Sequence, residues 1–121
     1  MNKEFKVSGG HKNTVESAYN ILKLGGNAFD AAIAGVFSSM SAEYLYTGAA
    51  SGGAMLVKKD GFSPLVVDFF VETPAIDPKK VADFKTIQAD FGDTKQEFNI
   101  GMSSVGIPGT LPGLIDIHKN Y

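Results

Sequence analysis

The stretch of residues 28–44 constrains the fold of this chain more than any other part of the sequence. Almost every face of the helix that it would form is apolar or small, and the small residues are Ala31, Ala32, Ala34, Gly35, Ser38, Ser39 and Ala42. A helix that is apolar all round has to be buried, and small side chains let neighbouring backbones approach it closely. A chain of 121 residues has difficulty covering such a helix on all sides, so we expect more protein around it.

The ends of this helix and of an amphipathic helix before it carry capping signals. Asn27 is expected to cap residues 28–44, with Asp30 near the third helical position. Upstream, Asn13 followed by Glu16 has the spacing of an N-cap with its return partner, and apolar residues then recur at helical spacing. This earlier helix is predicted to end at Gly25, because glycine adopts the left-handed conformation most easily.

Two strands are expected after the helices. Residues 54–58 and 64–70 are apolar runs separated by a Lys-Asp-Gly turn sequence, and together they predict a hairpin with at least one buried face. Asp77 and the proline after it then predict a short helix through Phe84. Residues 85–99 are polar and aperiodic, and we expect no regular structure there.

The end of the sequence predicts one more helix. Residues 104–109 are broken by glycine and proline and indicate a short extended segment. Thr110 is expected to cap the helix that follows, in which one face would be formed by Leu111, Leu114, Ile115 and His118.

Composition excludes several functional classes. Hydrophobic residues make up 44% and charged residues 20%, which is ordinary globular usage. All eleven basic residues are scattered lysines and the net charge is −2, so we expect neither a nucleic-acid partner nor a basic membrane patch. Without cysteine there are no disulfides, thiolate nucleophiles or zinc–cysteine sites. The longest apolar stretch, residues 28–42, is shorter than the ~20 residues that cross a bilayer.

The first five residues lack the apolar core of a secretory signal. This favours a cytoplasmic protein, and a periplasmic one remains open if a leader has been removed. The absence of cysteine is compatible with either compartment.

Three motifs resemble, in the same order, segments of the gamma-glutamyltransferase family. G-G-N-A-F-D-A-A at residues 25–32 follows His11 and a helix, as in the family's opening signature. The Gly/Ser loop at residues 47–53 leads into a strand, as does the family's glycine-rich loop. V-G-I-P-G-T-L-P-G-L at residues 105–114 resembles the family's V-G-V-P-G-x-x-x-G-L segment. The joint order is more specific than any one motif.

This resemblance implies an α+β fold that is part of a four-layer αββα N-terminal-nucleophile hydrolase sandwich. Family members are precursors that cut themselves to expose a threonine, whose amine and hydroxyl act as base and nucleophile. That threonine opens the second subunit, downstream of the region matched here. We therefore expect residues 1–121 to be a single domain fragment, the amino-terminal portion of a large subunit, with no catalytic residue and no activity alone.

The resemblance also implies the partners of the chain. These are the remaining large-subunit residues, the small subunit that carries the threonine, and a small-molecule amide substrate. No metal site and no cofactor are expected. The alternative is a stand-alone, non-enzymatic α+β interaction module that has kept the scaffold. If the chain is a truncation, exposed apolar surface is expected to promote its self-association.

The family's substrate contact in this region is an arginine in a D-F-R-E-T-like stretch, which clamps a carboxylate with its planar fork. The matching sequence here is D-F-F-V-E-T at residues 68–73, with one extra residue and Val71 in the arginine's place. The chain contains no arginine at all. We expect Glu72 to line the substrate cleft, with Phe70, Val71 and Thr73 beside it, although a solvated glutamate on an edge strand is the alternative. The absence of this arginine predicts an acyl substrate whose recognised end is less anionic, or is held by residues outside this segment.

Other conspicuous residues have simpler explanations. Gly52 and Gly53 are interpreted as close-packing positions, and Asn27 with Asp30 as a capping pair. The D-F-G sequence at residues 90–92 imitates a kinase motif but lacks the accompanying ATP loop, so it is interpreted as a solvated loop. The two histidines, His11 and His118, are interpreted as capping or packing residues, because neither has the partners of a catalytic triad.

Overall fold

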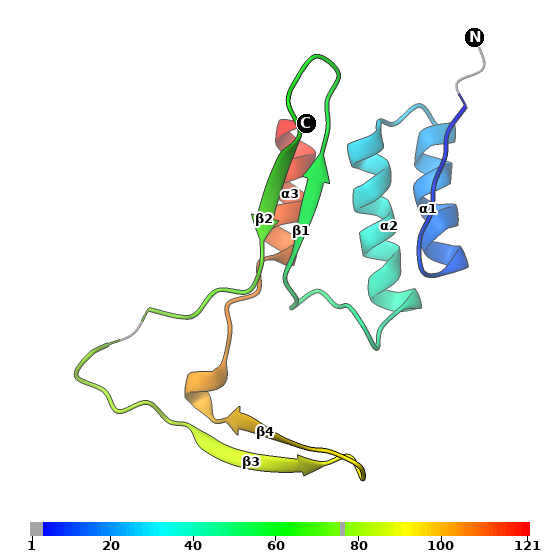
Figure 1. Ribbon diagram of the computed structural model, residues 1–121. Helices are drawn as coiled ribbons and strands as arrows, with labels where there is room; N and C mark the ends of the chain where they lie inside the picture. Colours follow the sequence, from blue (N-terminus) through cyan, green and yellow to red (C-terminus); the bar gives the residue numbers. More distant parts are fainter. Residues whose placement is uncertain (1–3, 76) are drawn as a thin grey trace. The chain divides into compact units, whose positions relative to one another are not determined.

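The computed structural model describes residues 4–75 and 77–121, which divide into two compact units (Figure 1). Unit 1 is formed by the described part of Met1–Phe70 together with Pro108–Tyr121, and unit 2 is Val71–Ile107. Both helices and antiparallel strands are present, so the α+β class is confirmed. None of the described helices is long and apolar enough to cross a membrane.

The first helix of unit 1, α1 (Lys12–Lys23), ends as predicted but begins differently. Gly25 has a φ of +97°, and the N–H groups of Gly25 and Gly26 donate to the carbonyls of Leu22 and Ile21 at 3.2 and 3.0 Å. This is a Schellman ending. The prediction of Asn13 as the N-cap is wrong: His11 is the cap, and its Nδ1 accepts from the Asn13 N–H at 3.1 Å. The backbone of His11 is extended, and the helix begins at the next residue, so Asn13 already lies inside it.

The second helix, α2 (Ala28–Ala42), starts with the predicted capping box. Asn27 Oδ1 accepts from the N–H groups of Phe29 and Asp30 at 2.8 and 3.0 Å, and Asp30 Oδ2 accepts from the Asn27 N–H at 3.2 Å. The helix ends two residues before the predicted end. Its buried residues are Ala31, Ile33 and Gly35, whereas Phe37 is 45% exposed. This chain therefore covers the apolar helix on part of its circumference.

A hairpin and a third helix complete unit 1. Strands β1 (Gly53–Val57) and β2 (Leu65–Phe69) pair antiparallel with Met55 opposite Val67, which confirms the predicted hairpin. The helix α3 (Thr110–Asn120) packs on this hairpin, as Figure 1 shows. The core consists of Ile33, Leu114 and Ile117, with Phe29, Val36, Met40, Met55, Val67 and Phe69 packed around it.

Two details of α3 correct the sequence prediction. Gly109 is the N-cap, and Thr110 is the first helical residue. The buried face is Thr110, Leu114 and Ile117, whereas Leu111, Ile115 and His118, which were predicted to share the apolar face with Leu114, are exposed. Apolar residues occupy two overlapping faces of this helix, and the face that packs into the core carries Leu114 and Ile117, with the Thr110 hydroxyl on the same side 2.9 Å from the Ser51 hydroxyl.

Unit 2 differs most from the sequence prediction. The helix expected from Asp77 to Phe84 is absent: the segment has one turn, in which the Asp77 carbonyl and Oδ1 accept from the N–H groups of Lys80 and Lys79, both at 3.0 Å. Val81 is 96% exposed, so burial does not stabilise a longer helix there.

The segment expected to lack regular structure is a hairpin of β3 (Lys85–Asp90) and β4 (Lys95–Ile100), followed by the short helix η1 (Met102–Ser104). The hairpin turn contains the D-F-G sequence, where Gly92 has a φ of +87° and the Phe91 N–H donates to the Thr94 carbonyl. The exposed-loop interpretation of D-F-G is thereby confirmed. The apolar alternation in these strands is limited to Ile87 with Ala89 and Phe98 with Ile100, and such a short pattern among polar residues did not reveal the hairpin.

Candidate functional site

The predicted substrate residues lie directly after β2. Phe70 belongs to unit 1, is 67% exposed, and donates its N–H to Asp68 Oδ1 at 2.9 Å. Val71, Glu72 and Thr73 begin unit 2. Glu72 forms an isolated antiparallel bridge with Ile107: the Glu72 N–H donates to the Ile107 carbonyl at 3.1 Å, and the reverse bond is 2.8 Å. The side chain of Glu72 is exposed, which suits either a cleft or a solvated strand end.

Within unit 2, Thr73 lines a hollow of about 430 Å³. Its other lining residues include Asp77, Lys80, Phe84, Met102 and Ser103. Asp83 also lines this hollow and is held to η1 by three bonds: its N–H donates to Ser103 Oγ at 2.7 Å, its Oδ2 accepts from the Met102 N–H at 3.1 Å, and its carbonyl accepts from the Ser103 N–H at 3.2 Å.

In unit 1, the last two glycines of the 105–114 motif pack closely on the end of β2. A Cβ built on Gly109 would overlap the carbonyl oxygen of Phe69, and one built on Gly113 would overlap the Phe69 Cβ. The ring of Phe69 also lies against Gly53, where a Cβ would be 3.0 Å from Cε2. Phe69 is thus the inward-facing phenylalanine of the pair, and the close-packing interpretation of Gly53 is confirmed.

The glycine-rich loop joins the same assembly through Ser51. The Ser51 carbonyl accepts from the N–H groups of Gly109 and Thr110 at 3.1 and 3.0 Å. The Ser51 Oγ lies 2.9 Å from the Thr110 Oγ1, and Thr110 is 3% exposed. This loop therefore binds the start of α3. The sequence analysis missed Ser51, because a serine among small residues gives no sign of a partner 59 residues away.

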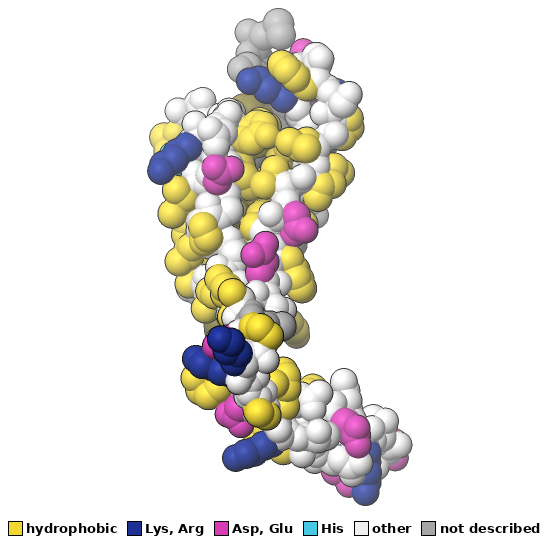
Figure 2. Space-filling model, turned by 90° about the vertical axis from the view of Figure 1, so that its left-hand side faces the viewer, with side chains coloured by type: hydrophobic (Ala, Val, Ile, Leu, Met, Phe, Trp, Pro, Cys, Tyr) yellow, Lys and Arg dark blue, Asp and Glu magenta, His cyan; other side chains and the backbone are white. Residues whose placement is uncertain are grey.

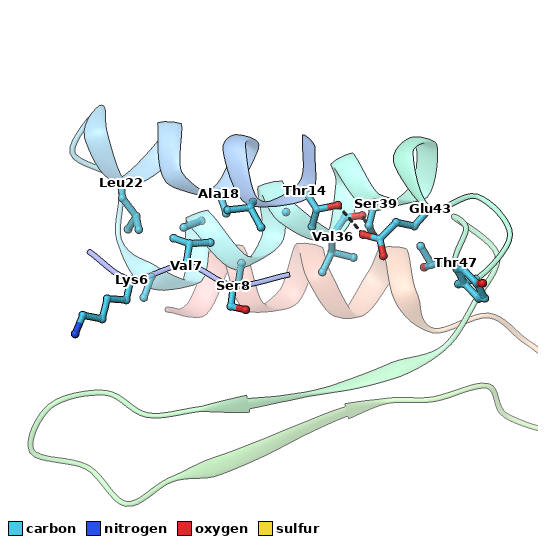
Figure 3. A pocket seen from close by; sticks show the side chains of 16 residues that line it. Lys6, Val7, Ser8, Thr14, Ala18, Leu22, Val36, Ser39, Glu43 and Thr47 are labelled. Carbon is cyan, nitrogen blue, oxygen red and sulfur yellow. Dashed lines mark hydrogen bonds between the residues drawn. The ribbon is translucent and has the colours of Figure 1, made fainter. Parts of the chain in front are cut away.

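A groove of about 580 Å³ lies between α1, α2 and the extended residues 6–8 (Figure 3). Small and apolar residues such as Ala18 and Val36 form most of its lining. Its polar end carries Glu43, whose Oε1 accepts from the Thr14 hydroxyl at 2.7 Å, while Lys6 stands at the opposite end in Figure 3. The groove offers apolar surface and one hydrogen-bonded carboxylate. It was not predicted, because its walls are separate helices.

The two histidines have structural partners. His11 caps α1, as its capping interpretation requires. His118 places Nδ1 3.1 Å from Asp30 Oδ1, and Tyr121 stacks on Phe29 with ring centroids 5.2 Å apart. The end of α3 is thereby joined to the beginning of α2, and Asp30 serves this contact in addition to the capping box.

These features define an α+β chain in which two glycine-containing segments, the 47–53 loop and the 105–114 motif, hold α3 against one hairpin. The family model for gamma-glutamyltranspeptidase matches residues 14–121. This chain belongs to the gamma-glutamyltranspeptidase family.

Two similar proteins agree with this assignment. The chain is 34% identical over 109 residues to a glutathione hydrolase proenzyme of Pseudomonas aeruginosa, covering 86% of this chain and 18% of that protein. It is 33% identical over 98 residues to acylase ACY 1 proenzyme of Pseudomonas sp. strain V22, covering 77% and 17%. The chain thus spans less than a fifth of the length of either relative.

Solved structures give the same result. The transpeptidase enzyme CapD of Bacillus anthracis superposes with a TM-score of 0.74 at 26% identity, covering 99% of this chain and 34% of that one. Gamma-glutamyltranspeptidase from Pseudomonas nitroreducens, complexed with L-DON, gives a TM-score of 0.74 at 25% identity, covering 100% and 35%.

Proposed function

We propose that this chain is the amino-terminal portion of the large subunit of a self-processing amidohydrolase or acyltransferase, and that it is inactive alone. The observation that carries the proposal is the assembly around Phe69, in which Gly53, Gly109 and Gly113 meet one strand end. The match over residues 14–121 supports it. The similarity to two proteins described as proenzymes also supports the proposal. The nucleophilic threonine would then come from the second subunit.

The proposed complete fold is the four-layer αββα sandwich, to which this single domain fragment contributes. One face of the β1–β2 hairpin packs on the helices, but the opposite face is bare, with Leu56 73% and Val66 59% exposed. Hydrophobic side chains are also prominent on the face drawn in Figure 2. Remaining large-subunit residues and the small subunit would cover such surfaces. Without them, we expect the purified chain to self-associate, and a stable monomer in light scattering would contradict this.

The proposed substrate-binding residues are Phe70, Val71, Glu72 and Thr73. No arginine is present to clamp a carboxylate, and Val71 supplies no charge. The named relatives include both a glutathione hydrolase and an acylase, at 34% and 33% identity, so kinship supports more than one kind of acyl donor. The substrate class that fits best is an amide whose acyl end is less anionic than a gamma-glutamyl group.

The test begins with the natural reading frame after codon 121. A continuing frame with a later threonine at a processing site supports the proposal, whereas a stop codon there favours the non-enzymatic interaction module. The complete protein is then assayed against gamma-glutamyl amides and neutral acyl amides, with the 121-residue chain as the control. We expect turnover of neutral acyl amides by the complete protein and none by the chain. Preference for gamma-glutamyl donors would overturn the substrate assignment. Turnover by the 121-residue chain would overturn the proposal that it is inactive alone.

A further inference from the structure

Gly106 and Val71 approach each other more closely than a side chain at position 106 would allow. A Cβ built on Gly106 would overlap the Cγ1 of Val71, and its next neighbours would be the Val71 Cβ at 3.6 Å and the Glu72 carbonyl oxygen at 3.7 Å. Both residues belong to unit 2. The bare α-carbon of Gly106 therefore lies directly against the side chain of residue 71.

Space, and not backbone conformation, explains the glycine at this position. The described glycines with positive φ are Gly25, Gly61, Gly92 and Gly101. Gly106 is not among them, so its backbone is accessible to any residue. What an added methyl group would change is the contact with Val71, a β-branched side chain with few alternative rotamers.

One backbone bridge lies directly beside this contact. Residues 72 and 107, the next neighbours of Val71 and Gly106, are joined by the paired bonds of 3.1 and 2.8 Å. This bridge is isolated, with no further rungs beside it. An added methyl group would therefore either displace the side chain of residue 71 or break the bridge.

We propose that Gly106 is a specificity-determining positioning residue, which sets the space and direction available to the side chain at position 71. The proposal rests on the proposed function, in which residue 71 contacts the acyl substrate. Gly106 acts on the substrate only through residue 71.

The first test measures coupling in the complete protein by amide hydrogen exchange at Glu72 and Ile107, because unit 2 has no buried residue of its own among those described. Gly106→Ala should accelerate exchange at both amides at least about tenfold, since overpacking of this kind is costly. Val71→Ala should change exchange little, and the double variant should return to within about threefold of the parent. Gly48→Ala is the matched control, because a Cβ there meets nothing within 4 Å. Unprotected amides in the parent, or no rescue by Val71→Ala, would overturn the proposal.

The second test uses the complete protein and a panel of acyl amides. Gly106→Ala should raise KM for the preferred acyl donor several-fold while leaving kcat nearly unchanged, and Val71→Ala in the same protein should reduce that difference. Unchanged KM together with intact exchange coupling would overturn the specificity role. Failure of the proposed function would look different, because the complete protein would then turn over none of the amides while the coupling measured by amide exchange persisted.

Discussion

The two units of this chain are stabilised by different means. Unit 1 has a hydrophobic core in which Leu114 and Ile117 are fully buried and Ile33 is 8% exposed. In unit 2 none of the described residues, 71–75 and 77–107, is buried. Unit 2 depends on backbone ladders and polar contacts such as those of Asp83. Because a hydrogen bond contributes only about 1 kcal/mol net and a lone hairpin is marginal, unit 2 requires surface from outside these residues.

The β3–β4 ribbon shows the same imbalance in its two faces. Its polar face is paired within the ribbon, with Thr86 Oγ1 3.0 Å from Asn99 Oδ1 and Lys95 Nζ 3.5 Å from Asp90 Oδ2. The opposite face carries Ile87 directly across from Phe98, and these side chains are 44% and 40% exposed. Unit 1 buries some of its apolar side chains in a core of its own and leaves others exposed, whereas none of the described residues of unit 2 is buried.

The largest effect is expected from Leu114→Ala in the core of unit 1. Leu114 is fully buried, so its truncation leaves a cavity and should lower the free energy of unfolding by about 2–5 kcal/mol. Chemical denaturation followed by circular dichroism measures this. The matched control is Leu56→Ala, which should change stability by less than about 0.5 kcal/mol because Leu56 is 73% exposed. Equal losses in the two variants would refute the distinction between core and bare sheet face.

Next in size is Gly113→Ala, which tests the close approach of α3 to β2. In an open helix this change would stabilise by roughly 1 kcal/mol. Here the new Cβ would overlap the Cβ of Phe69, so we expect a loss of about 1–3 kcal/mol. The sign of the change in denaturation midpoint decides between the two, and Gly48→Ala serves as the control in open space. A stabilised Gly113→Ala variant would mean that α3 stands farther from the hairpin.

A smaller loss is expected at the start of α2. Asn27→Ala removes the acceptor for the Phe29 and Asp30 N–H groups and should cost about 1 kcal/mol. Asn13→Ala is the matched control, since Asn13 has a similar sequence context but its side chain does not cap α1, and it should cost less than about 0.5 kcal/mol. Thermal denaturation of both variants measures the difference. A reversed order would show that the sequence interpretation of Asn13 was correct and that His11 is not the cap.

The sequence predicted unit 1 well because burial leaves a pattern in it. The capping box at Asn27, the ending at Gly25 and the β1–β2 hairpin all follow from local signals. The errors at Asn13 and Thr110 were choices between capping residues one or two positions apart: His11 caps α1 through the Asn13 N–H, and Gly109 precedes Thr110. In unit 2 the β3–β4 hairpin was missed, because the apolar alternation in each strand extends over only two apolar residues.

The predicted site residues were found through one sequence match, and local pattern could not have revealed their surroundings. Residues 68–73 are contiguous, so the match located them directly. Their structural partners, Gly106 and Ile107, lie more than thirty residues away along the chain. The contact between Val71 and the α-carbon of Gly106 depends on how the segments around the Glu72–Ile107 bridge are aligned. The sequence of either segment alone does not specify this alignment.

The smallest effect on unit 1 is expected from Phe98→Ala, although it removes a whole aromatic ring. Truncating a buried phenylalanine typically costs about 3–5 kcal/mol, but Phe98 is 40% exposed on a ribbon without a core. Unfolding of unit 1, followed by amide exchange in β1 and α3, should therefore shift by less than about 0.5 kcal/mol. Exchange in β3 and β4 should be faster than in β1 already in the parent, and faster again in the variant. If Phe98→Ala instead destabilised β1 and α3 as much as Leu114→Ala does, the two units would unfold as one cooperative body, and the ribbon's apolar face would have to be covered within this chain.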